Sequence, residues 1–152
     1  MRSKRSHDQT GGPVLSHARP LPHQAVIPSD LCAAREIEEE ILRQAETCGY
    51  SPECGFAIRL ALEEAVVNAH KHGNKGDPNK KIVISYRVDP HCVVVRVRDD
   101  GPGFDPASLP DCTAPDRIDL PCGRGIMLMN AYMDSVTYNE QGNEVQLIKE
   151  RC

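Results

Sequence analysis

Two adjoining segments rich in β-branched residues limit the folds open to this chain more than any other feature. Residues 81–89 (KIVISYRVD) and 91–99 (HCVVVRVRD) are dominated by Val and Ile, which favour strands. Pro90 lies in the turn between them. These segments predict a pair of neighbouring strands, and a sheet of this kind needs further elements to cover its apolar face.

Two helical segments precede these strands. Apolar residues keep helical spacing through residues 31–48, and Ser29 and Asp30 are candidate caps. A second start signal at Ser51 predicts a helix that runs to about His72. The apolar positions of this second helix cover more than one stripe, so we expect it to be largely buried.

Weaker sequence signals predict further strands and a helix on either side of these central segments. Residues 24–28 predict an edge strand, and residues 134–139 and 144–149 predict a final hairpin. A short helix from Gly123 to Met133 precedes that hairpin. The order of elements predicts an α+β fold, a two-layer sandwich with helices on one face of a mixed, mostly antiparallel sheet.

The chain divides into a tail and one domain. Residues 1–23 contain four basic side chains against one acidic, several Pro and Gly residues, and few spaced apolar residues, so we expect a disordered basic tail. Residues 24–150 fit a single domain, in keeping with a total length of 152 residues.

Composition excludes several classes of protein. The net charge of −4 and the 4% aromatic content argue against direct binding of nucleic acid. No apolar run is long enough to span a membrane. The seven Cys residues form no Cys-x-x-Cys pair, so we expect free thiols in a reducing cytoplasm rather than a zinc site or a disulfide scaffold.

The second helical segment carries two polar residues on an otherwise apolar surface. Glu64 and Asn68 are four residues apart, which places them on one helix face. Such a carboxylate can deprotonate a nucleophile, and such an amide oxygen can bind a hard cation. A solvated helix edge is the alternative interpretation.

A glycine-containing turn follows the second of the paired strands. Asp99 can accept a hydrogen bond from a ligand amino group, and Gly101 and Gly103 allow the backbone to approach a ligand closely. An ordinary turn would use the same residues.

A second glycine pair opens the short helix. Gly123 and Gly125 flank Arg124, and free N–H groups at a helix N-terminus suit an anion. Alone this pair is poor evidence, and no P-loop motif occurs in the chain.

Together the three clusters resemble the motifs of the GHKL ATPase superfamily, which has the Bergerat ATP-binding fold. ALEEAVVNAHKHGN is similar to its N box, RDDGPGFD to its D-x-G-x-G box, and GRGIMLMNAYMDSVTYNEQGNEVQLIK to its second glycine box and terminal hairpin. The resemblance covers roughly residues 25–149 and is strongest to the small bacterial anti-sigma-factor serine/threonine kinases.

This resemblance implies a role for each residue of the motifs. Glu64 would be the general base, Asn68 the Mg²⁺ ligand, and Asp99 the reader of adenine. Residues 104–122 would form a lid over ATP. The remaining ATP-binding positions that it implies are Gly101, Gly103, Gly123, Arg124, Gly125 and Asn143; where many relatives have Thr, Asn143 stands in this chain.

The resemblance also implies a function. The chain would use ATP and Mg²⁺ to phosphorylate a STAS-type anti-anti-sigma protein and would sequester a sigma factor, as a cytoplasmic homodimer. The alternative is a non-catalytic module that binds ATP or ADP and captures a regulatory partner. Glu64 favours the kinase, because a pure binding module needs no base there.

Overall fold

The structure is a computed structural model that describes residues 20–103 and 124–152. Within these ranges, strands and helices follow one another in the predicted order. The elements are β1 (His23–Pro28), α2 (Leu31–Thr47), α3 (Pro52–Asn68), the π-helical turn η3 (Ala69–Gly73), β2 (Lys81–Val88), β3 (Cys92–Asp99), α4 (Arg124–Tyr132), β4 (Ser135–Tyr138) and β5 (Glu144–Glu150).

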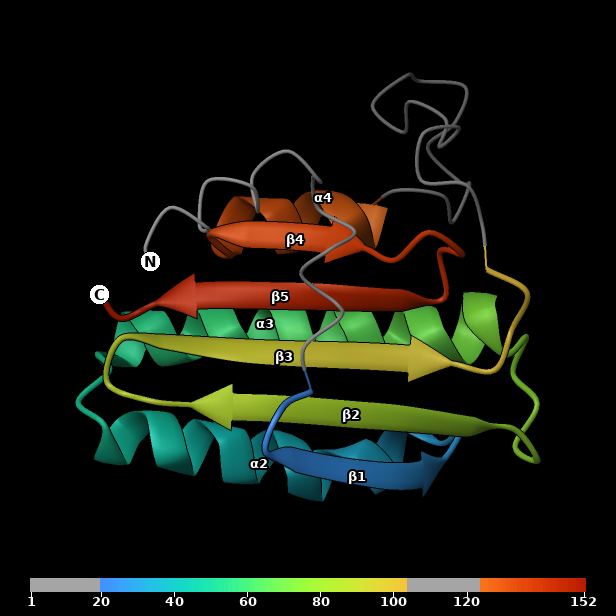
Figure 1. Ribbon diagram of the computed structural model, residues 1–152, viewed down its shortest axis with the longest axis horizontal. Helices are drawn as coiled ribbons and strands as arrows, with labels where there is room; N and C mark the ends of the chain where they lie inside the picture. The colour runs from blue at the N-terminus through green and yellow to red at the C-terminus, as the bar shows by residue number, and fades with distance from the viewer. Residues whose placement is uncertain (1–19, 104–123) are drawn as a thin grey trace, which may run out of the picture.

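The five strands form one sheet in the order β1-β2-β3-β5-β4. Helices α2 and α3 lie behind the sheet in Figure 1, and α4 lies behind its β4 edge. The two-layer α+β fold is therefore confirmed. Every pairing between the described strands is antiparallel, so this sheet contains no parallel pair that would make it mixed.

A continuous apolar core fills the space between sheet and helices. Alternate residues of the central strands point into it, and α3 buries residues along most of its length, as expected. Phe56, near the start of α3, is an exception and remains 58% exposed. The largest fully buried apolar side chains are Ile41, Ile58, Leu62, Ile82, Ile84, Met129 and Leu147.

The caps of the two long helices are only partly those expected. The Asp30 carboxylate accepts a hydrogen bond from the Cys32 N–H and caps α2, and the Ser51 hydroxyl accepts one from the Cys54 N–H and caps α3. Ser29, the other candidate cap, is instead buried at 1% exposure and bonds elsewhere.

The end of the second helix differs from the prediction. The α-helical part stops at Asn68 rather than about His72, and the chain continues through the wider turn η3. The Asn74 N–H then donates to the Ala69 carbonyl at 2.8 Å, a π-type bond. Apolar spacing cannot reveal such a turn, because one extra residue per turn changes the pattern only locally.

The expectation of free thiols is wrong for one pair of cysteines. Cys54, at the start of α3, and Cys152, beyond the end of β5, form a disulfide with a Cα–Cα distance of 5.9 Å. The two residues are 98 positions apart, so only the fold brings them together. Cys32, Cys48 and Cys92 are free.

Two predicted segments lie outside the described residues, namely residues 1–19 of the expected tail and residues 104–122 of the expected lid. At the boundary between tail and domain, β1 begins at His23. None of the helices in residues 20–103 and 124–152 has the length and apolar character needed to cross a membrane.

A buried carboxylate on α2 makes the stability of the fold depend on pH. Glu38 is 7% exposed. Its burial, and next the charge of Glu63 on α3, raise the pKa of Glu38 to about 7, while Arg59 and Arg35 oppose the shift. Between the ordinary pKa of 4.5 and about 7, the folded chain therefore binds a proton that the unfolded chain has lost, and stability falls as the pH rises.

We expect Glu38→Gln to raise the free energy of unfolding at about pH 8 by up to about 3 kcal/mol, since each unit of pKa corresponds to about 1.4 kcal/mol. At about pH 4, where Glu38 is protonated in both states, the substitution should have little effect. Urea unfolding curves at the two pH values measure the difference. An equal effect at both values would contradict the assignment of the shift to Glu38.

Candidate functional site

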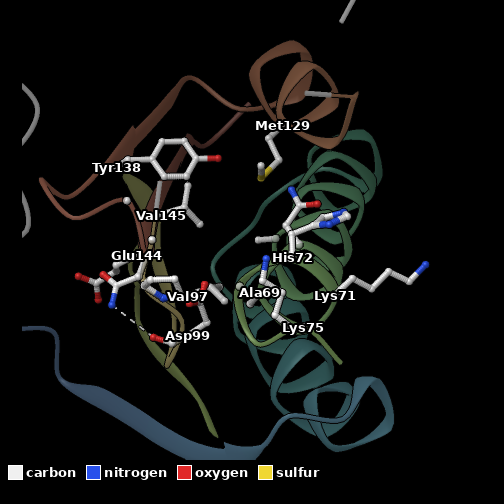
Figure 2. Close-up of a pocket in the computed structure, with 17 residues that line it drawn as sticks. Ala69, Lys71, His72, Lys75, Val97, Asp99, Met129, Tyr138, Glu144 and Val145 are labelled. Carbon is white, nitrogen blue, oxygen red and sulfur yellow. Dashed lines mark hydrogen bonds between the residues drawn. The ribbon is translucent and has the colours of Figure 1, made fainter. Parts of the chain in front are cut away.

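A cavity of about 440 Å³ lies between the sheet and the helical layer. Figure 2 shows Val97 and Val145 on the sheet side, Ala69 opposite them, and Met129 of α4 above. The Tyr138 ring closes the upper end, with its hydroxyl directed into the cavity. These apolar walls, and a volume in the range of small-molecule sites, suit a flat organic ligand.

Asp99 is the carboxylate in the wall of this cavity. It is the last residue of β3 and is half-buried. Its Oδ1 accepts a hydrogen bond from the Gly101 N–H at 2.8 Å. Burial raises the pKa of Asp99, although the Gly101 hydrogen bond opposes the shift. The strand end and the following turn together hold this carboxylate where a ligand can donate to it.

Two glycines allow the chain to pack directly against Asp99. A Cβ on Gly73, at the end of η3, would overlap the Asp99 carboxylate, and a Cβ on Gly101 would overlap the Gly73 carbonyl. Any larger residue at either position must displace its neighbour. Gly101 was predicted as a site residue; it is buried beside the cavity rather than in its wall. Gly73 was missed, although it stands in the N-box-like segment.

Gly103 and Asn143 are brought together with Asp99, as the motifs predicted, and both line the cavity. Gly103 has φ +82°, and a Cβ there would overlap the Gln141 carbonyl. The Asn143 carbonyl accepts from the Asp99 N–H at 2.9 Å, and its Nδ2 donates to the Asp99 carbonyl at 3.4 Å. The turn between β4 and β5 therefore holds the end of β3 in place.

Asn139 organises that turn and was not predicted. Its Oδ1 accepts from the backbone N–H groups of Gly142, Asn143 and Glu144 at 2.8, 3.1 and 3.2 Å. Its Nδ2 donates to Asn143 Oδ1 at 2.8 Å. The Asn-Glu-Gln-Gly-Asn sequence carried the signal, because Asn commonly bonds its own turn backbone.

Asn68 and Glu64 are placed differently with respect to the cavity. Asn68, the last residue of α3, lines it. Glu64 lies one turn earlier on α3 and is half-buried, but it is not part of the cavity wall. No hydrogen bond or ion pair joins Glu64 to another residue of the described ranges. The structure therefore brings Asn68, but not Glu64, to the cavity surface.

Three basic side chains of the helical layer also line the cavity and were not predicted to bind a ligand: Lys71, His72 and Lys75. In Figure 2 the Lys71 ammonium reaches away from the interior. Burial, and then the charges of Lys71 and Lys75, lower the pKa of His72. A lowered pKa favours the neutral form of His72, so the positive charge at the rim comes from Lys71 and Lys75, and it favours an anionic group there.

The second glycine pair is only partly described. Gly123 lies outside the described residues, and Arg124 and Gly125 are the first residues of α4. Their contact with phosphate stays a prediction. In the described ranges, no cluster of three or more His, Cys, Asp or Glu side chains could hold a metal ion. A cation at this site would therefore depend on few protein ligands and on oxygens of the ligand itself.

The cavity combines features that suit one kind of ligand. Its apolar walls fit a planar ring, Asp99 can accept from an amino group on that ring, and Asn68 offers a neutral amide oxygen. The basic rim fits an anionic extension of the same molecule. A phosphorylated purine that carries an amino group has each of these parts.

Comparisons with known proteins agree with this chemistry. The model of the histidine kinase-like ATPase domain family matches residues 27–149. A serine-protein kinase RsbW from Listeria innocua is 29% identical over 112 residues, which are 69% of this chain and 71% of the relative. An anti-sigma F factor from Anoxybacillus flavithermus is 34% identical over 98 residues, which are 60% of this chain and 66% of the relative.

A solved structure supports the fold. It contains the RsbU and RsbW domains of a Mycobacterium tuberculosis protein and matches with a TM-score of 0.54 at 17% identity. The match covers 88% of this chain and 32% of the solved chain. At this identity the likeness concerns the arrangement of the backbone.

Proposed function

Because this chain belongs to the histidine kinase-like ATPase domain family, we propose that it is an ATP-dependent protein serine kinase of the anti-sigma type. Membership of this family implies the use of ATP. The relatives named serine-protein kinase RsbW support the kinase activity, and those named anti-sigma F factor support the anti-sigma role. The same names support a sigma factor and an anti-anti-sigma protein as partners. The STAS type of the second partner and the action of the kinase as a homodimer are part of the proposal.

The observation that carries the proposal is the position of Asp99. It presents a carboxylate beside the apolar part of the cavity wall. The Gly101 N–H donates to that carboxylate, and the Asp99 N–H donates to the Asn143 carbonyl, so both neighbouring turns hold the residue. A half-buried carboxylate of this kind favours a ligand that donates to it, because a polar group that loses water without gaining a partner costs free energy. Adenine, with its exocyclic amine, is such a ligand.

Asn68 fits the role of a metal ligand. Its amide lines the cavity on the helical side, and amide and phosphate oxygens are ligands that Mg²⁺ accepts. When bound there, Mg²⁺ would neutralise charge on the phosphate oxygens. Lys75 lies on the same side of the cavity and adds positive charge for the phosphates, and the neutral His72 beside it can donate or accept a hydrogen bond.

Glu64 is the proposed base. Transfer of a phosphoryl group depends mainly on positioning and on charge neutralisation, so the protein's task at the acceptor is to orient a serine hydroxyl and take its proton. Glu64 is half-buried one helical turn from Asn68 and has no described partner to occupy its oxygens. A serine of a docked partner protein would reach it from outside the cavity wall.

Asn68→Ala should weaken the binding of ATP in Mg²⁺ about tenfold, since hydrogen-bonding or ligating oxygens of this type each contribute about 1–2 kcal/mol. In EDTA, where no cation bridges Asn68 to the phosphates, wild type and variant should bind ATP equally. Calorimetric titration under both conditions measures the effect. Unchanged affinity in Mg²⁺ would remove Asn68 from the metal site.

The proposal as a whole is tested with the purified chain, radiolabelled ATP and a candidate STAS protein. Saturable binding of ATP, followed by label on a serine of the partner, is the expected result. A stable complex without transfer would support the non-catalytic module instead. Absence of saturable ATP binding in millimolar Mg²⁺ would overturn both readings.

A further inference from the structure

Asn74 is a fully buried amide whose hydrogen bonds go to three other segments. It follows η3 and is 0% exposed. Its Nδ2 donates to Ser29 Oγ at 3.0 Å and to the Lys81 carbonyl at 3.0 Å. Its Oδ1 accepts from the Asp100 N–H at 2.8 Å. Both of its donor hydrogens and its acceptor are therefore used.

The partners of Asn74 come from parts of the chain that are far apart in sequence. Ser29 lies between β1 and α2, Lys81 opens β2, and Asp100 follows β3. Ser29 extends the network, because its hydroxyl is 2.8 Å from His70 Nδ1. Since Ser29 Oγ accepts from Asn74, its own hydrogen can be donated to that nitrogen. The Asn74 side chain thus links the end of the helical layer at η3 to the ends of strands β1, β2 and β3.

The bond to Asp100 acts on Asp99. Asn74 holds the backbone N–H immediately after Asp99, and the Gly101 N–H holds the Asp99 carboxylate itself. On the other side, Gly73, the residue before Asn74, lies directly against that carboxylate. The distance between the η3 turn and the turn after β3 is therefore set by the Asn74 side chain.

We propose that Asn74 is a positioning residue for base recognition, holding the turn after β3 so that the Asp99 carboxylate faces the amino group of a bound purine. This inference rests on the proposed ATP-binding function. It assigns Asn74 no contact with the ligand. Loss of the network should allow Asp99 to shift, which weakens recognition of the amino group more than the other contacts of the nucleotide.

The test compares the binding of ATP and of inosine triphosphate, which has a carbonyl group where adenine has its amino group. Wild type should prefer ATP. In Asn74→Asp, the acceptor for Asp100 remains but both donated bonds are lost, and we expect affinity for ATP to fall about tenfold and the preference for ATP to fall about fivefold. A purely structural loss would weaken both nucleotides equally and leave the preference unchanged.

Two further variants complete the experiment. Ser29→Ala removes one partner and keeps the bond from Asp100, so it should lower the preference for ATP in the same direction by a smaller factor. Asn79→Ala alters an exposed asparagine of the same loop and should change nothing. Melting curves recorded for each protein show which variants fold. If Asn74→Asp does not fold, the comparison with wild type is made with Ser29→Ala.

The outcomes separate this inference from the proposed function. If wild type binds ATP and the folded variants keep its full preference over inosine triphosphate, Asn74 is not a positioning residue, while the proposed function stands. If wild type itself binds no ATP, both proposals fall. A reduced preference in Asn74→Asp and Ser29→Ala, with Asn79→Ala unchanged, supports the inference.

Discussion

Glu64→Gln should bind ATP as wild type does and transfer its phosphoryl group to a protein serine about 10²–10⁴-fold more slowly, the usual contribution of a positioned base. The amide has nearly the same shape as the carboxylate but cannot take the serine proton. Because Glu64 lies outside the wall of the cavity, its replacement leaves the surface that meets the nucleotide unchanged. Calorimetry for binding and a radiolabel assay for transfer separate the two effects.

Glu63 provides a matched control for that substitution. It is the neighbouring glutamate on α3 and is exposed to solvent. Glu63→Gln makes the same change of charge one residue away and should retain transfer. Full transfer by Glu64→Gln would remove Glu64 from the mechanism. Loss of ATP binding in that variant would instead assign Glu64 a role in the nucleotide site.

Gly73→Ala should weaken ATP binding about 10–100-fold. The added methyl group would occupy the space of the Asp99 carboxylate, which must then move or turn away from the cavity. The loss corresponds to about 1.5–3 kcal/mol, the contribution of a hydrogen bond to a charged group. Titration with ATP measures the effect, and a thermal melt establishes that the variant is folded.

The control for this variant is another glycine of the same helical layer. Gly55 lies in the first turns of α3, and a Cβ there would meet nothing within 4 Å. Gly55→Ala should leave ATP binding unchanged and stabilise the fold by about 0.5–1 kcal/mol, because Ala favours helix more than Gly does. Equal ATP affinity in Gly73→Ala and Gly55→Ala would show that Asp99 does not depend on Gly73.

The described site lies at one end of the sheet, where β3 ends and β5 begins, and the disulfide lies at the other end, where β5 ends and α3 begins. Helix α3 connects the two ends, with Cys54 in its first turn and Asn68 as its last residue. Helix α3, which carries Asn68 at its end, is therefore tied at its start to the segment that follows β5.

The sequence alone predicted the order of elements and several of the residues that line the cavity. β-branched runs, helical spacing and cap residues were sufficient for the strands and helices, because these signals are local. The resemblance of three motifs to those of GHKL ATPases predicted the family, and the match to the histidine kinase-like ATPase domain confirms it. The resemblance also selected Asn68, Asp99, Gly103 and Asn143, which the fold brings to one cavity.

Only the tertiary structure decided the contacts between distant segments. The π-helical turn η3, the Cys54–Cys152 disulfide, and the role of Asn74 each depend on residues that meet across the fold. The same holds for Gly73, whose missing side chain matters only because Asp99 lies against it. A pattern along the chain records what each segment prefers by itself, whereas these features arise from how two segments pack together.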